Sequence, residues 1–211
     1  MSFISSLFPK KIKTFFKKFR NFNSIHNLDK KMLNYINYSK GFYIECGAND
    51  GVDQSNTWYF EKKMNWTGFL IEPHPLIFNE LKKNRSKKNI FINKALGNYR
   101  NNNKFVYLTN DDLTSKTKLN ENNIKNNIKV QVSTLTDILN QYNSPKVIDF
   151  FSLDVEGFEN LVLQGIDFEK YKFKYFLIET KNQEVINYLS LKNYTIVERL
   201  SHHDLLFRYN N

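Results

Sequence analysis

Two glycines frame a turn that is surrounded by acids in residues 42–56, which read FYIECGANDGVDQSN. Glu45 precedes the turn and Asp50 lies within it. A glycine turn after a strand commonly holds phosphate, and dinucleotide-binding sheets use the spacing Gly-x-Gly-x-x-Gly for this. Here Gly47 and Gly51 give Gly-x-x-x-Gly instead. Because the acids would also repel a pyrophosphate, the stretch favours a ligand that carries positive charge.

Another acid, Glu72, ends the next apolar run, about 20 residues past the turn, where nucleotide-binding sheets hold ribose hydroxyls with a carboxylate. S-adenosylmethionine fits this combination, because it carries an ammonium, a sulfonium and a ribose. The alternative is that Glu45 and Glu72 are ordinary strand-end acids that cap neighbouring helices. The expected cofactor-binding residues are Glu45, Gly47, Ala48, Asn49, Asp50, Gly51, Ser55, Glu72 and Pro73.

A further group of acids follows an apolar run in residues 153–159, which read LDVEGFE. Asp154 ends that run, so we expect its side chain to face the same crevice as the glycine turn. A carboxylate there could orient an acceptor hydroxyl, accept its proton or hold a divalent cation. Glu156 and Glu159 come at the start of the next helix, where acids also suit the helix dipole. We expect Asp154 and Glu156 to be catalytic and Glu159 to stabilise the helix.

Two histidines, His202 and His203, precede the last apolar run. Histidine titrates near neutral pH, so His203 is a third candidate for the catalytic base. A metal role is disfavoured, since adjacent residues of an extended chain point in different directions; a plain loop role is the alternative. His74 follows Glu72 closely and is expected either beside the adenosine or at a helix start.

Apolar runs alternate with helix-like segments along the rest of the chain, which indicates a mostly parallel sheet covered by helices on both faces. A short link, SHHD, joins the last two strands, so we expect an antiparallel pair at the sheet edge. The expected strands are 42–46, 68–72, 90–94, 147–155, 175–180, 194–200 and 205–209. The expected helices are 53–64, 76–87, 134–141, 158–164 and 182–191.

Two segments differ from this pattern. Within residues 1–22, apolar side chains recur at helical spacing and lysines fall on the opposite face, which is typical of a basic amphipathic helix. Such a helix would either lie on an anionic membrane surface or dock on the protein's own domain. Residues 101–127 are rich in asparagine and predict a surface loop with a short strand at 105–108. We expect a lead-in at 1–40 and one domain at 41–211.

The bulk composition restricts the protein's class. The 211 residues suit one domain with a sizeable core, and the formal charge of +10 favours anionic partners. Cys46, the one cysteine, lies in an apolar run, so we expect it to be buried and unreactive. No run approaches the ~18 apolar residues of a membrane span, and no secretory signal pattern is present. These features predict a cytoplasmic protein, or one bound peripherally to the inner face of a membrane.

Two stretches resemble the FkbM-type S-adenosylmethionine-dependent methyltransferases: IECGANDGVDQSNTWYFEKKMNWTGFLIEPHP and IDFFSLDVEGFENLVLQGIDF. The resemblance begins at about residue 42 and continues to the C-terminus, and it is weakest in residues 101–127. It implies the class I methyltransferase fold, an α/β, Rossmann-like, doubly wound and mostly parallel seven-stranded sheet with an antiparallel last strand. It also implies O-methylation, commonly of sugar or natural-product hydroxyls.

The expected function is therefore methyl transfer from S-adenosylmethionine to a hydroxyl of a carbohydrate, a glycan or a related, even nucleotide-linked, small molecule. One alternative is a catalytically silent binding module, which would not need Asp154. The other is a nucleic-acid methyltransferase. Enzymes of that kind that methylate amino groups usually carry Asn/Asp-Pro-Pro-Tyr/Phe after the fourth strand, where this chain has Asp-Val-Glu-Gly. Nucleic acid is therefore a disfavoured partner, and a divalent metal is an open question.

Overall fold

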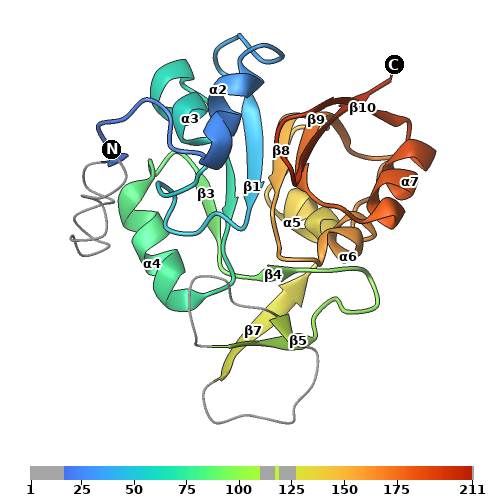
Figure 1. Cartoon of the computed structure of the whole chain (residues 1–211). Helices are drawn as coiled ribbons and strands as arrows, with labels where there is room; N and C mark the ends of the chain where they lie inside the picture. The colour runs from blue at the N-terminus through green and yellow to red at the C-terminus, as the bar shows by residue number, and fades with distance from the viewer. Residues whose placement is uncertain (1–16, 110–116, 119–126, 211) are drawn as a thin grey trace.

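The computed structural model describes residues 17–109, 117–118 and 127–210 (Figure 1). Its centre is a seven-stranded sheet of order β10-β11-β9-β8-β1-β2-β3. Neighbouring strands from β3 to β9 are parallel, whereas β11 is antiparallel to both β9 and β10. The predicted class I arrangement is confirmed. The strands are β1 (Phe42–Cys46), β2 (Thr67–Ile71), β3 (Ile90–Ile92), β8 (Val147–Leu153), β9 (Lys172–Glu179), β10 (Tyr194–Arg199) and β11 (Asp204–Tyr209).

Helices cover both faces of this sheet, and the side chains of successive strand residues pack into two separate cores on its opposite faces. Along β1, Tyr43 packs into one core and Ile44 into the other, and both are fully buried. This explains why the central strands are nearly continuous apolar runs. The first core is closed by α2 (Leu28–Met32), α3 (Trp58–Met64) and α4 (Pro75–Asn84), and the second by α5 (Leu135–Gln141), α6 (Glu159–Leu163) and α7 (Gln183–Leu191).

Two of the helices begin where polar side chains cap their first turns. Thr134 accepts a hydrogen bond from the backbone N–H of Asp137 at the start of α5. Asn182 accepts one from Glu184 at the start of α7. These caps satisfy backbone donors that have no partner within the helix. The predicted helices at 134–141 and 182–191 are confirmed to within a residue at each end.

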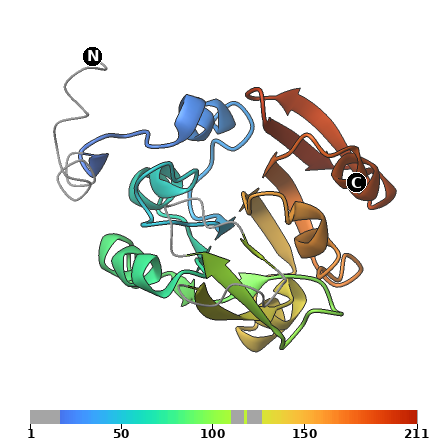
Figure 2. The ribbon, with the colours of Figure 1, turned by 60° about the horizontal axis from the view of Figure 1, so that its bottom comes forward.

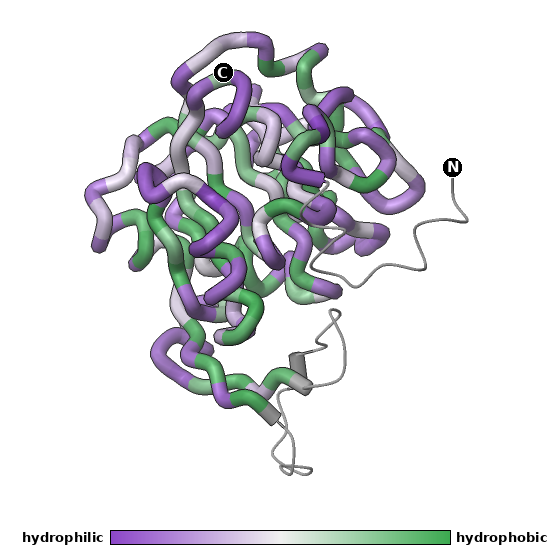
Figure 3. The backbone as a smooth tube through the Cα atoms, turned by 90° about the vertical axis from the view of Figure 1, so that its left-hand side faces the viewer, coloured by the Kyte–Doolittle hydropathy of each residue, from purple (hydrophilic) through white to green (hydrophobic). Residues whose placement is uncertain are grey.

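A second, smaller sheet has the order β4-β7-β5-β6. It lies at the bottom in Figure 1, comes forward in Figure 2 and projects from the rest of the chain in Figure 3. A short strand within 101–127 was predicted and is present as β5, but the other three were missed. The strands are β4 (Ala95–Leu96), β5 (Phe105–Thr109), β6 (Thr117–Lys118) and β7 (Asn127–Ser133). The rest of the predicted loop, 110–116 and 119–126, lies outside the described residues.

The predicted amphipathic helix lies mostly outside the described residues, which begin at Lys17. The part that is described touches the domain: Lys17 pairs with Asp53, and Phe22 stacks on Tyr59 with ring centroids 4.6 Å apart. A short 3₁₀ helix, η2 (Ile25–Asn27), leads into α2, whose Met32 is fully buried. In the described part of the chain, no helix combines the length and apolarity needed to cross a membrane.

Candidate active site

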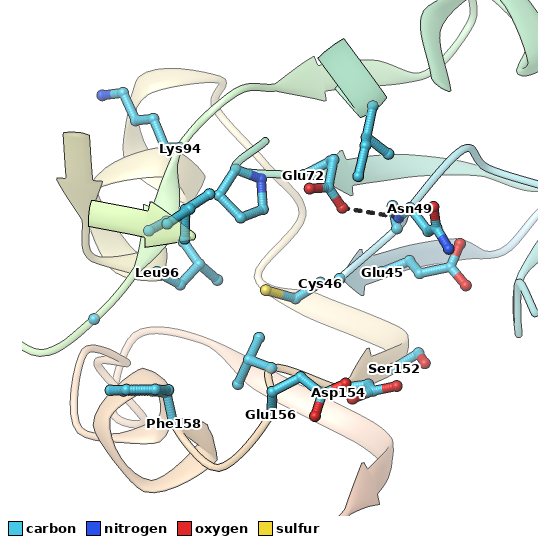
Figure 4. A pocket seen from close by; sticks show the side chains of 18 of the residues that line it. Glu45, Cys46, Asn49, Glu72, Lys94, Leu96, Ser152, Asp154, Glu156 and Phe158 are labelled. Carbon is cyan, nitrogen blue, oxygen red and sulfur yellow. Dashed lines mark hydrogen bonds between the residues drawn. The ribbon is translucent and has the colours of Figure 1, made fainter. Parts of the chain in front are cut away.

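A cavity of about 220 Å³ lies between the carboxyl ends of the central strands and the small sheet (Figure 4). Parallel strands bring their carboxyl ends to one edge, and this edge is where open α/β sheets bind ligands. The wall is formed by the turn after β1, the segments after β2, β3 and β8, and the small sheet. Expected site residues in the wall are Glu45, Gly47, Ala48, Asn49, Ser55, Glu72, Pro73, Asp154 and Glu156.

The turn after β1 needs glycine at its first position. Gly47 has φ +81°, and a Cβ built there would lie 2.0 Å from the backbone oxygen of Asp154. Only a residue without a side chain lets β1 approach the end of β8 this closely. The backbone N–H groups of Gly47 and Ala48 both donate to the carbonyl of Ile71, at 3.1 and 3.0 Å. The turn is therefore fixed to both strands that flank β1.

Glu72 is held in the cavity wall by backbone amides. The N–H of Asn49 donates to its Oε2 at 3.0 Å (Figure 4), and the N–H of His74 donates to its Oε1 at 2.9 Å. Each carboxylate oxygen can accept more than one hydrogen bond, so hydroxyls in the cavity can add to these. A fixed carboxylate next to a glycine turn fits the ribose and the cationic part of S-adenosylmethionine. His74 also begins α4, where its ring accepts from Ile77.

Glu45 lies in the cavity wall, and its carboxylate also organises the turn that follows β1. It accepts hydrogen bonds from the Ser55 hydroxyl, the Asn56 N–H and the Thr57 hydroxyl. Gln54 has a left-handed backbone with φ 66°. These features hold residues 53–57 in a non-helical turn, which is why the helix predicted at 53–64 begins only at Trp58. Glu45 was expected to bind cofactor; it lies in the cavity wall, and this network fixes the direction of its carboxylate.

Asp50 and Gly51 were expected to bind cofactor, but neither is part of the cavity wall. The Asp50 carboxylate accepts from the N–H groups of Val52 and Asp53, at 2.9 and 2.8 Å, so it shapes the turn. Gly51 has φ +78°, and a Cβ there would lie 2.5 Å from Leu81. The acid that seemed aimed at a ligand is therefore part of the turn's own hydrogen bonding.

Sequence reasoning missed Arg85, the residue that neutralises these buried acids. Its side chain is fully buried, with Nε 2.6 Å from Glu61 and Nη1 3.3 Å from Glu45. Burial alone would raise the pKa of Glu61. The charges of Arg85 and then Lys62 outweigh this effect and lower the pKa to about 2. The sequence around Arg85, NRSKKN, reads as exposed and basic, so it carries no signal of a buried ion pair. Its other donors bond to Tyr43, Gly51, Ser55 and Thr57.

Asp154 and Glu156 lie across the cavity from Glu72 (Figure 4). The backbone N–H of Asp154 donates to the carbonyl of Cys46 at 3.2 Å, which continues the pairing of β8 with β1. Burial raises the pKa of the Asp154 carboxyl far above its usual range, and Glu179 and Glu156 raise it further. Asp154 is therefore a carboxyl that keeps its proton to unusually high pH and binds a transferred proton strongly.

Glu179, the last residue of β9, was also missed as a site residue. Leu153 pairs with Ile178 in the register of β8 with β9, so Asp154 and Glu179 follow side by side. The sequence did contain an indication of Glu179 as a site residue, because this acid ends a buried strand just as Glu72 follows one. His203 is not in the cavity wall. The His203 carbonyl accepts from the Thr180 N–H at 2.7 Å, which gives it a loop role in the pairing of β9 with β11.

Glu159 has the structural role expected of it. Its Oε1 accepts from the N–H of Gly157 at 2.9 Å and from that of Val155 at 3.3 Å. Cys46 is buried, as expected. The pKa of its thiol is raised by burial and then by the nearby charges of Glu72 and Asp154. Within the described ranges, no group of three or more His, Cys, Asp or Glu residues is arranged to hold a metal ion.

One side of the cavity is apolar and comes largely from the small sheet. The sequence did not reveal this apolar wall, because the apolar residues of the small sheet alternate with polar residues in and around an asparagine-rich region. Lys94 and Asn101 add polar groups on the same side. The cavity thus joins a carboxyl-rich end to an apolar wall, an arrangement suited to an organic ligand with polar groups. The larger apolar residues of the wall are Ile77, Leu96, Val106, Leu108, Val132, Val155, Phe158 and Leu161.

Comparisons with known proteins identify the family of this chain. The model of the methyltransferase FkbM domain matches residues 45–199. A methyltransferase FkbM from Methylobacillus flagellatus KT superposes with a TM-score of 0.52 at 13% identity, over 95% of this chain and 59% of that one. This chain therefore spans 59% of the length of that protein. No curated protein matches the chain significantly.

Other solved methyltransferases are more distant. The methyltransferase domain of METTL16 has a TM-score of 0.49 and 12% identity, over 86% of this chain and 64% of that one. A precorrin-6y C5,15-methyltransferase from Geobacter metallireducens GS-15 has a TM-score of 0.49 and 8% identity, over 89% and 87%. The family match covers most of the chain, including every residue that lines the cavity. The chain belongs to the FkbM methyltransferase family.

Proposed function

We propose that this chain transfers a methyl group to a hydroxyl of a carbohydrate, a glycan or a related small molecule. The observation that carries the proposal is the placement of Asp154 in the cavity wall, across from the amide-held carboxylate of Glu72. One acid suits the cofactor's ribose and the other suits the acceptor. A cavity with only the first would serve a binding module, which has no use for a proton acceptor at the far wall.

The cofactor supplies an electrophilic methyl group, and the protein binds and orients it. Glu72 would accept hydrogen bonds from the ribose hydroxyls, because its two backbone donors fix its carboxylate at the wall. Gly47 would let the cofactor approach the backbone of the turn, since no side chain stands there. Glu45 and Ser55 would keep the turn in shape from behind, through the Arg85 network.

Asp154 would receive the proton of the acceptor hydroxyl. A neutral alcohol is a poor nucleophile, so alignment of its oxygen with the methyl carbon supplies much of the rate. Removal of its proton by a placed base typically adds about 10²–10⁴-fold. A base works best when its pKa is near the working pH, and burial with the neighbouring acids moves the Asp154 carboxyl in that direction.

The charge at this end of the cavity favours an acceptor that is neutral around its methylated hydroxyl. Asp154 and Glu156 line the wall there, and Glu179 lies beside Asp154. Carboxylates accept hydrogen bonds from several hydroxyls at once, whereas they repel phosphate. A sugar ring meets these conditions better than a nucleic-acid backbone does. The net charge of +10 would then act on other surfaces of the molecule.

The cofactor part is tested by calorimetry. S-adenosylmethionine or its demethylated product should bind, and NAD should not. Glu72→Gln should weaken binding by about 1.5–3 kcal/mol, since a charged acceptor of hydrogen bonds is lost. Glu169→Gln makes the same change on an exposed surface and should bind as the unaltered protein does. Tight NAD binding without an S-adenosylmethionine signal would refute the assignment.

The acceptor part is tested with S-adenosylmethionine labelled in its methyl group. The protein is incubated with separate pools of glycans, nucleotide-linked sugars, RNA and DNA. Label should enter the glycan or sugar pool as an alkali-stable ether, and Asp154→Asn should lower this turnover by about 10²-fold while it keeps cofactor affinity. Label in nucleic acid alone would establish the alternative enzyme. Cofactor binding without label in any pool would support the silent module.

A further inference from the structure

Three neighbouring strands each place an acid at the same level of the sheet, beside the cavity. The register pairs Leu153 of β8 with Ile178 of β9, so the next residues are Asp154 and Glu179. The register of β9 with β11 pairs Glu179 directly with Asp204. The side chains of Asp154 and Glu179 are thus close enough for their carboxyls to form a hydrogen bond when one of them carries a proton. Two carboxyls can be joined in this way only when one of them is protonated.

We propose that Asp154 and Glu179 work as one carboxyl pair that holds a single proton, and that Glu179 is the positioning residue which keeps this proton on Asp154. The proposal rests on the methyltransfer proposed above and adds a residue that lies outside the cavity wall. Like charges in contact cannot both ionise easily, which is why such pairs retain one proton at neutral pH.

The charges around the pair favour the shared proton. Asp154 faces Glu156 and Glu159 from its own segment and the Cys46 thiol on β1. Glu179 faces Asp204 at the start of β11, His203 just before it, and Glu156. In the described part of the chain, neither Asp154 nor Glu179 forms an ion pair with a lysine or arginine. The pKa of Glu179 is raised by burial and then by the charge of Asp204. The pKa of Asp154 is raised by burial and then by the charge of Glu179.

The pair gives the acceptor's proton a place to go. As the acceptor oxygen bonds to the methyl carbon, sulfur keeps the electron pair of the broken carbon–sulfur bond. Asp154 takes the hydroxyl proton, and the proton it already carries moves to Glu179. The pair thus passes from one proton and a single negative charge to two protons and no charge. The positive charge of the cofactor and the negative charge of the pair disappear together.

The shared proton can be tested without an acceptor. The side-chain carboxyl carbons of aspartate are labelled with ¹³C, and Asp154 is assigned by its loss in Asp154→Asn. In the unaltered protein its signal should titrate well above the ordinary range of aspartate. In Glu179→Gln it should titrate lower by about one pH unit or more, because the hydrogen-bonded charge is gone. The Glu179 side chain as a whole is exposed, although its carboxyl is partly desolvated beside Asp154, so this variant should fold.

Two matched variants separate a shared proton from a general field. Glu156→Gln removes a nearby charge without removing the pair's hydrogen bond, so it should shift the Asp154 titration less than Glu179→Gln does. Glu169→Gln should not shift it. Equal shifts for Glu156→Gln and Glu179→Gln, or no shift for Glu179→Gln, would overturn the proposal. If the protein methylates an acceptor but the Asp154 titration does not shift in Glu179→Gln, the shared proton is refuted and the proposed function stands. If the titration shifts but no acceptor is methylated, the proposed function is refuted and the shared proton stands.

Discussion

Nη1 of Arg85 lies 3.3 Å from Oε2 of Glu45, directly behind the turn that lines the cavity. Neither side chain of this pair has appreciable exposure to solvent, and Glu61 completes it from α3 at 2.6 Å. A buried charge without its partner keeps the whole cost of its lost hydration. The pair therefore connects the shape of the cofactor turn to the stability of the fold.

Arg85→Leu should lower the free energy of unfolding by about 3–5 kcal/mol, because it leaves Glu45 and Glu61 buried without a counter-charge. Urea unfolding followed by circular dichroism measures this difference. Lys83→Ala is the control, since the Lys83–Glu80 pair on α4 is well exposed and should contribute less than about 1 kcal/mol. Equal effects of the two substitutions would contradict a stabilising buried network.

The stability of the protein should fall in acid partly through Glu61. Its pKa is held at about 2, below its ordinary value, so its contribution is present above pH ~4.3 and is lost as the pH falls toward 2. Glu61→Gln has no charge to lose. The difference in unfolding free energy between the unaltered protein and Glu61→Gln should therefore shrink from pH 5 to pH 2.5. A constant difference would show that the charge of Glu61 is not what Arg85 stabilises.

Gly47→Ala should damage the fold and the cofactor site together. Its backbone is left-handed, and the added Cβ would meet the Asp154 carbonyl at 2.0 Å. Gly157→Ala is the control, because Gly157 also has a positive φ of +97° but nothing lies within 4 Å of its Cβ position. Gly157→Ala should cost about 1–2 kcal/mol of stability from the backbone alone. Gly47→Ala should cost more and should weaken cofactor binding in calorimetry, which Gly157→Ala should not.

The N-terminal segment should bind anionic membranes. Residues 1–22 combine lysines with an apolar stripe, and the described end of the segment, from Lys17, already touches the domain. Vesicles with anionic lipid should bring down the full chain at low salt and less of it at high salt. Removal of residues 1–16 should abolish this binding and leave the Lys17 contact in place. Equal binding to neutral vesicles, or none by the full chain, would support docking alone.

The sequence predicted elements well where burial imposes one pattern. The bounds of β1 were predicted correctly, because its residues are buried on both faces of the sheet. By contrast, β7 was missed because its inward-facing residues, Ile128, Val130 and Val132, lie within a region dominated by polar residues. The functions of Glu45 and Asp50 depend on side-chain direction, which the sequence does not specify. Arg85 carried no signal at all.

Asp154→Asn should stabilise the protein at neutral and alkaline pH, although it lowers turnover by about 10²-fold. Burial, then Glu179 and Glu156, raise the pKa of Asp154 above its value of about 3.9 in an unfolded chain. The native state therefore holds a proton that the unfolded state releases, so stability is full below pH ~4 and declines as the pH rises through the native pKa. Asparagine resembles the protonated acid and has no proton to lose.

Urea unfolding at pH 5 and pH 8.5 measures this effect. The variant should gain on the unaltered protein between these pH values by an amount on the order of 1–3 kcal/mol, a range that allows for the partial exposure of the carboxyl. Glu169→Gln, a carboxyl-to-amide change on an exposed surface, should show no such gain. If the difference between Asp154→Asn and the unaltered protein is the same at both pH values, Asp154 ionises normally. A base that costs stability in its charged form is expected of a residue retained for chemistry rather than for folding.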